Sequence, residues 1–233
     1  MKFLFLTLCI SILGWSSPAM AGPEWTEKSP RKEISPKFEQ TKDELILRAP
    51  EKEGIHGWFQ SKIPVEGGSL VRFSVERLAK NIDYPRRSCA VRIEWQGEKG
   101  KAVTSPHPVN PVYFGKGEGS AKPDYPRDRS TDSDGWVKVE DEFKIPDDAV
   151  TAVVQLHLRW APGGELSWRD FRLEPIDQLT SRKVTLAAVH LNLQGSGRTV
   201  AENRDLFQPL IEEAAGKNAD LVVLPELLTC KGV

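Results

Sequence analysis

Apolar and polar residues alternate over most of the stretch from residue 44 to residue 175. An alternation with a period of two predicts half-buried antiparallel strands. The apolar positions of the longest runs are Val71, Phe73 and Val75; Cys89, Val91, Ile93 and Trp95; Val137, Val139, Phe143 and Ile145; and Val154, Leu156, Leu158 and Trp160. About seven or eight short strands without a helical pattern are typical of a β-sandwich. Residues 44–175 are therefore predicted to form an all-β, jelly-roll-like sandwich.

The parity of these runs also predicts which side chains form the core. The expected core residues are Phe73, Ile93, Trp95, Leu156 and Leu158. The apolar parity flips after Trp168, which indicates a β-bulge near Arg169 and Asp170. Cys89 lies on the apolar parity and is expected to be a buried thiol. His157 lies on the polar parity and is expected to be solvated.

The first residues have the pattern of a targeting segment. Lys2 supplies a positive charge, residues 3–15 form a short apolar region, and residues 19–21 read Ala-Met-Ala. This series predicts a signal peptide over residues 1–21, an exported protein and a mature N-terminus at Gly22. An uncleaved membrane anchor is the alternative. No later stretch is apolar enough to span a membrane, and the polar, proline-containing residues 22–43 are predicted to be a flexible lead-in.

The pattern changes after a predicted linker at residues 176–182. Residues 184–189 form a continuous apolar run, which predicts a strand covered on both faces. Thr199 and Glu202 fit a capping box at the start of a helix, in which Pro209 is expected to introduce a kink or an early end. Residues 219–224 predict a second buried strand. A strand, a helix and a strand in this order predict a right-handed βαβ unit with parallel strands.

This segment resembles the start of the carbon–nitrogen hydrolase (nitrilase) superfamily. The resemblance rests on residues 183–189, 202–203, 213–215 and 219–227, the last of which reads Ala-Asp-Leu-Val-Val-Leu-Pro-Glu-Leu. It implies an α/β/β/α fold, a Glu–Lys–Cys catalytic set, and attack on the carbon of a small amide or nitrile substrate. The glutamate of the motif maps onto Glu226, as a general base whose pKa burial at the strand end would raise.

The lysine and cysteine of that set lie far beyond the glutamate in the family. Cys230 and Lys231 are of the right types, but they are too close to Glu226 to match those positions, and neither role is transferred to them. His190 stands where the family usually has glutamine. Residues 183–233 are therefore expected to be a truncated N-terminal part of the hydrolase domain, without activity in this chain.

The sandwich resembles, more loosely, carbohydrate-binding or galactose-binding-like modules. The features that carry this resemblance are Gly135-Trp136 before a strand, a turn at Pro146, and the closing segment 166–173. A long insertion at residues 97–135 contains three aromatic residues, Tyr113, Phe114 and Tyr125. They would either stack on a sugar ring or pack within the loop.

Composition removes several functional classes. The 32 basic and 33 acidic residues are interspersed, and the absence of a basic stripe argues against nucleic-acid binding. No cluster has metal-ligand spacing, and no cofactor is expected. The main reading is an exported carbon–nitrogen hydrolase represented by its N-terminal part. The alternative is a secreted carbohydrate- or ligand-binding sandwich with a remnant hydrolase segment, and a third reading makes the sandwich a brace for a catalytic domain.

Overall fold

The computed structural model describes residues 23–104, 120–181, 183–191, 197–226, 228 and 230. It divides the chain into two compact units, Met1–Leu179 and Thr180–Val233, and the division falls within the predicted linker. The signal-peptide prediction for residues 1–21 lies outside the described residues. Within those residues, no helix combines the length and the apolar character needed to cross a bilayer.

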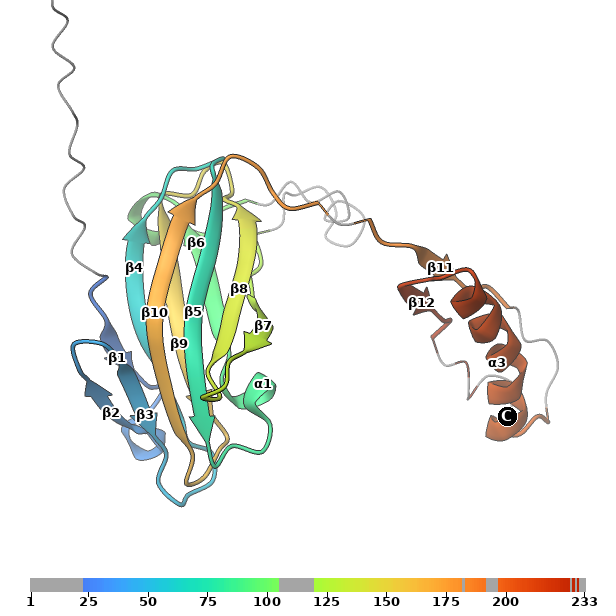
Figure 1. The fold of residues 1–233 in the computed structure, drawn as a ribbon, viewed down its shortest axis with the longest axis horizontal. Coiled ribbons are helices and arrows are strands. Elements are labelled where there is room, and N and C mark those ends of the chain that lie inside the picture. The colour runs from blue at the N-terminus through green and yellow to red at the C-terminus, as the bar shows by residue number, and fades with distance from the viewer. Residues whose placement is uncertain are drawn as a thin grey trace, which may run out of the picture. The chain divides into compact units, whose positions relative to one another are not determined.

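The first unit is a sandwich of two antiparallel sheets, as the alternation predicts. Figure 1 shows the six-stranded sheet in front, with β9 and β6 of the four-stranded sheet behind it. The four-stranded sheet has the order β1 (Thr26–Lys28), β4 (His56–Pro64), β9 (Thr151–Arg159) and β6 (Val91–Gln96). The six-stranded sheet has the order β2 (Lys37–Gln40), β3 (Leu45–Arg48), β10 (Glu165–Pro175), β5 (Leu70–Lys80), β8 (Val137–Lys144) and β7 (Arg127–Thr131). Short helical segments among the described residues of this unit are η1 (Lys32–Ile34), α1 (Pro85–Ser88) and η2 (Glu98–Gly100).

The core lies between the inner faces of the two sheets, where the alternation places it. The side chains of Phe73, Ile93, Leu156 and Leu158 are fully buried, and Trp95 is almost so. Burying an apolar side chain of this size contributes about 1.5–3 kcal/mol to the stability of the fold. The predicted core residues are therefore confirmed.

The predicted bulge in β10 is also confirmed. The register against β5 shifts between Arg169 and Arg172, and Asp170 has a φ of 52°. The extra residue lets Trp168, before the bulge, and Phe171, after it, both face the interior. The Phe171 ring meets the Phe73 ring edge-on, with 5.6 Å between their centroids.

The flexible lead-in predicted for residues 22–43 is wrong over much of its length. β1 pairs with β4, and β2 pairs with β3, so the segment supplies an edge strand to each sheet. Trp25 anchors it through an edge-on contact with Phe171, at 5.3 Å between ring centroids. Edge strands are held largely by backbone hydrogen bonds, and polar side chains protect them from further pairing. Their polar sequence therefore resembled that of a loop.

The second unit contains β11 (Leu186–Ala188), α3 (Val200–Gly216) and β12 (Leu221–Val223). The two strands are parallel and joined through the helix, as predicted. Thr199 and Glu202 form the predicted capping box. Pro209 lies inside α3, which nevertheless runs to Gly216 without interruption, so the shortening is not observed.

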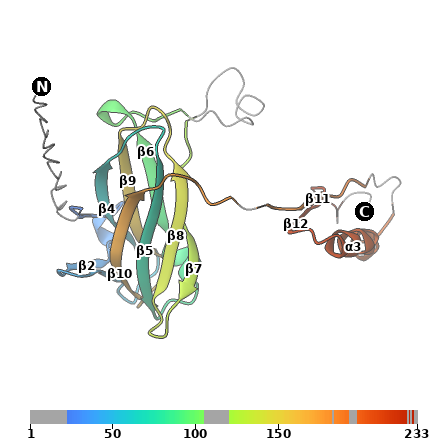
Figure 2. The same cartoon turned by 45° about the horizontal axis from the view of Figure 1, so that its top comes forward.

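The two strands of this unit are shorter and more exposed than their apolar runs predicted. Figure 2 shows α3 along one side of β11 and β12, and Phe207 of α3 is buried there. Leu186, Leu221 and Val223 are more than half exposed. Within the described part of this unit, the small sheet is therefore covered on one face only.

Candidate ligand-binding face of the four-stranded sheet

The solvent side of β4, β9 and β6 carries aromatic, imidazole and amide groups. Because Phe59 and Leu156 point into the core, their sequence neighbours point outward. The register places Trp58 opposite His157 and Gln60 opposite Gln155. Directly opposed residues of an antiparallel pair have Cβ atoms about 4.5–5.5 Å apart on the same face. These side chains therefore meet on one surface.

Three rings form a cluster at one end of this surface. The centroid of the Trp58 ring lies 5.0 Å from that of His157 and 5.3 Å from that of His56. The two imidazoles are 5.4 Å apart, and all three pairs are tilted by between 32° and 42°. His56 and Trp58 are half-buried, so the cluster remains accessible to a ligand.

A hydrogen-bond chain holds the two imidazoles. The Nε2 atom of His157 lies 3.1 Å from Oε1 of Gln155, and its Nδ1 atom lies 3.2 Å from Nε2 of His56. The amide oxygen is an acceptor, so neutral His157 donates through Nε2 and accepts through Nδ1 from the N–H of His56. Both rings are thereby fixed in orientation and tautomer.

The chain continues across the sheet through the amides. Nε2 of Gln155 donates to Oε1 of Gln60 at 3.2 Å, and Nη1 of Arg92 donates to Oε1 of Gln155 at 3.0 Å. The indole N–H of Trp58 donates to the same Gln60 oxygen at 3.4 Å. The network spans three strands and positions the tryptophan ring that borders it.

His157 is not solvated, contrary to the prediction. It is only 7% exposed, because Trp58 and His56 of the adjacent strand cover it. Burial lowers its pKa to about 3, with further lowering by the positive charges of His56, Arg159 and Arg92. Burial and Arg159 also lower the pKa of His56. Both imidazoles are therefore neutral at pH 7.

The aromatic residues singled out in the long insertion have different outcomes. Tyr113 and Phe114 lie outside the described residues. Tyr125 is 55% exposed and follows Asp124, whose backbone pairs with Ile93 of β6 and whose carboxylate accepts from the indole N–H of Trp95 at 2.7 Å. Tyr125 is thus placed beside an edge strand of the four-stranded sheet.

Glu226 follows β12 by three residues. It lies in a turn and is exposed, so the burial expected to raise its pKa is not observed. Cys230 is exposed as well, and Lys231 lies outside the described residues. Cys89 is buried, as predicted, and burial raises the pKa of its thiol to about 12. It is therefore a core side chain in thiol form.

The residues described here include no group of three or more histidine, cysteine, aspartate or glutamate side chains arranged to hold a metal ion. Pattern reasoning missed Trp58, His56, Gln60 and Gln155 as a set. In the sequence, these residues share one feature: they are uncharged or aromatic and they occupy outward positions of strands. Charged residues are usual at such positions on a solvated sheet face.

No protein-family model matches the chain, and no curated protein matches it. Among solved structures, it is similar to the enzymatically active domain of bacteriophage CBA120 tailspike protein 4, with 13% identity, a TM-score of 0.44, and coverage of 66% of this chain and 19% of that one. It is also similar to the C-terminal family 22 carbohydrate binding module of Clostridium thermocellum Xyn10B, with 12% identity, a TM-score of 0.39, and coverage of 70% and 92%. A third structure is TmCBM61 in complex with β-1,4-galactotriose, with 12% identity, a TM-score of 0.35, and coverage of 65% and 88%. TM-scores of this size assign the chain to no family.

Proposed function

We propose that this chain is an exported carbohydrate-binding protein whose site is the outward face of β4, β9 and β6. The observation that carries the proposal is the cluster of Trp58, His56 and His157, joined by hydrogen bonds to the amides of Gln60 and Gln155. Sugars combine apolar C–H faces with many hydroxyl groups. A tryptophan beside amide and imidazole groups offers a complementary surface. Export rests on the signal-like residues 1–21.

The state of these groups before binding favours this role. Their orientations are fixed by hydrogen bonds within the sheet, so little side-chain entropy remains to be lost when a ligand binds. The two neutral histidines avoid the desolvation cost that a charged imidazolium would add on ligand contact. A set of fixed, neutral groups of this kind suits a polysaccharide chain laid along the sheet.

The test is binding of the full chain to a panel of soluble polysaccharides by affinity electrophoresis, followed by isothermal titration with those that bind. Replacing Trp58 with alanine should weaken binding at least about tenfold, because a central aromatic contact dominates an interface of this type. The backbone of β4 pairs on both sides and should keep its register.

The matched control is Trp136→Ala, which removes the same side chain from the outer side of the six-stranded sheet. Trp136 is only 7% exposed and lies under the guanidinium of Arg169, 3.8 Å from its ring centroid. If circular dichroism shows that Trp136→Ala is folded, the variant should bind the polysaccharides as tightly as the unsubstituted chain. Binding that survives Trp58→Ala unchanged would contradict the proposal.

A second candidate function concerns residues 180–233, and we propose it as the opening segment of a carbon–nitrogen hydrolase-like fold. It is supported by the parallel pairing of β11 and β12 through α3 and by the position of Glu226 just after β12. Glu226 is the residue to which we would assign the general-base role. The lysine and cysteine that would complete its set are not matched in this sequence.

For that reason we expect the 233-residue chain to show no hydrolysis of amides or nitriles. A general base contributes about 10²–10⁴-fold to a rate, but only when a nucleophile is present for it to activate. Release of ammonia from a set of simple amides and nitriles should stay at the buffer level, with and without Glu226→Gln. Turnover that this substitution removes would overturn the expected inactivity.

A further inference from the structure

Positive charge on the four-stranded face is only partly compensated. Among the outward positions of its four strands, the single acidic side chain is Glu94, and it is already paired with Arg92. Lys28 lies opposite Trp58, and Arg159 lies opposite His56. Neither of these two cations forms an ion pair within the described residues, although the whole chain has a net charge of −1.

Two guanidinium groups lie near the same indole at the end of β9. Those of Arg159 and Arg87 lie 4.7 Å and 5.2 Å from the ring centroid of Trp160, an indole that is half exposed. Nε of Arg159 also donates to the backbone carbonyl of Arg87 at 3.0 Å. No described carboxylate pairs with either group, so neither positive charge is compensated by an ion pair. An arrangement of this kind becomes favourable when an anion joins it.

The cations and the aromatic cluster are close enough for one ligand to contact both. Arg159 lies two residues beyond His157 on the same face of β9, about 7 Å along the strand. Lys28 is in the cross-strand row of Trp58 and His157. A sugar ring stacked on Trp58 would therefore place its substituents within reach of cations on two sides.

We propose that the ligand of this face is an anionic polysaccharide, with the sugar ring on Trp58 and its acidic substituent bound by Arg159 and Arg87. This inference rests on the proposed function and adds the chemical class of the ligand. The acidic group is a hexuronate carboxylate or a sulfate ester, since both accept the forked hydrogen bonds of a guanidinium. Lys28 adds a second, less directional attraction from the β1 edge.

The experiment compares two charged probes with their neutral counterparts, using the full chain. The pairs are polygalacturonate with its carboxyl-reduced product, and dextran sulfate with dextran. One charged probe should bind at least about tenfold more tightly than its neutral partner, and its affinity should fall as salt rises. The pair that shows this preference identifies the acidic group as carboxylate or sulfate.

Arg159→Gln should weaken binding of the preferred charged probe about five- to tenfold, the loss expected for a charge-assisted hydrogen bond. The matched control is Arg172→Gln, which removes one exposed guanidinium from the six-stranded face. It should have no effect. An equal loss in both variants would indicate bulk charge attraction and overturn the proposed site.

Failure of this inference can be distinguished from failure of the proposed function. Equal affinity for charged and neutral probes, abolished in both cases by Trp58→Ala, would overturn the acidic specificity and leave carbohydrate binding at this face intact. Binding to another neutral member of the polysaccharide panel, without binding to either charged probe, would overturn the inference and leave the function. Absence of binding to these four probes and to the whole panel would overturn both.

Discussion

The two outer faces of the sandwich share one core but differ in chemistry. On the six-stranded sheet, acids and bases neutralise each other in pairs: Arg72 with Glu142 at 2.7 Å, Arg169 with Glu76 at 2.9 Å, and Lys138 with Glu140 at 2.6 Å. On the four-stranded sheet, the central groups are neutral amides and imidazoles around a tryptophan, and the cations near them are largely unpaired.

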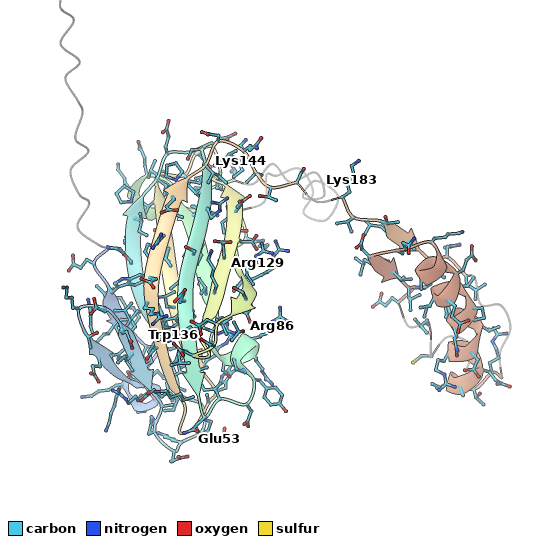
Figure 3. The ribbon with its side chains drawn as sticks, in the orientation of Figure 1. Glu53, Arg86, Arg129, Trp136, Lys144 and Lys183 are labelled. Carbon is cyan, nitrogen blue, oxygen red and sulfur yellow. The ribbon has the colours of Figure 1, made fainter. Side chains whose placement is uncertain are left out.

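The tryptophans on the two faces illustrate the difference. Trp136, labelled in Figure 3, lies beneath the guanidinium of Arg169, which covers its ring. The ring contacts of Trp58 within the described residues are with the tilted imidazoles of His56 and His157, and the indole remains half-buried. One indole has thus already been used by the protein for a cation–π contact. The other keeps part of its ring surface exposed.

The six-stranded face is hollowed, and the chemistry of its hollow differs from that of the aromatic cluster on the four-stranded face. A groove of about 370 Å³ runs along β5, β8 and β10, with Arg72, Glu76, Glu140 and Glu174 among its lining residues. Much of this charge is already engaged in ion pairs. Concavity alone therefore does not mark the proposed binding face. That face is distinguished by its available aromatic surface and by donors that form no ion pair.

The largest effect that we expect is on the pH dependence of the free energy of unfolding. This effect comes from the four-stranded face and would therefore sharpen the contrast between the two faces. The pKa of His157 falls from its ordinary value of 6.5 to about 3 on folding. Between pH 6.5 and about 3, His157 is therefore protonated in the unfolded chain and neutral in the folded chain. The contribution of His157 is present above pH 6.5 and is lost as pH falls towards 3, at about 1.4 kcal/mol per pH unit.

The measurement is the free energy of unfolding in urea between pH 6.5 and 5, where most carboxylates stay ionised. His56 acts in the same direction, while Asp124, whose pKa burial raises, acts in the opposite direction. Comparison with His157→Gln isolates the contribution of the histidine. In that variant the slope of the free energy of unfolding against pH should be smaller by the amount that one bound proton contributes, about 1.4 kcal/mol per pH unit. An unchanged slope in the variant would show that His157 does not titrate as its burial requires.

Sequence pattern was sufficient where a local rule and the tertiary structure agree. Alternation located Phe73, Ile93 and Leu156 in the core, because a pleated strand with one buried face must have that period. The parity flip in β10 located the bulge at Asp170 for the same reason. The capping box at Thr199 was readable because all its atoms lie within one turn of chain.

Pattern was insufficient where a residue's role depends on distant neighbours. His157 reads as polar and outward, yet His56 and Trp58, about 100 residues earlier, bury it. The edge strands β1 and β2 are similar cases, since their pairing partners decide their conformation. The candidate site was missed for this reason, because it exists only once β4, β9 and β6 lie side by side.

The smallest expected effect concerns an ion pair on the six-stranded face. Lys138 and Glu140 are in contact at 2.6 Å, but their side chains remain 44% and 24% exposed. Water screens such a pair, and holding two long side chains in one geometry has an entropic cost. A double-mutant cycle with Lys138→Ala and Glu140→Ala should therefore give a coupling of about 0.2–1 kcal/mol in the free energy of unfolding.

Raising the salt concentration should reduce this coupling further, because mobile ions screen exposed charges over about 3 Å at 1 M salt. The same variants should leave polysaccharide binding unchanged, since they lie on the opposite sheet from Trp58. A coupling of several kcal/mol, or a loss of binding, would contradict the view that this face is a solvated surface of mutually paired charges. Either result would mean that the six-stranded face contributes to the fold or to recognition as much as the four-stranded face does.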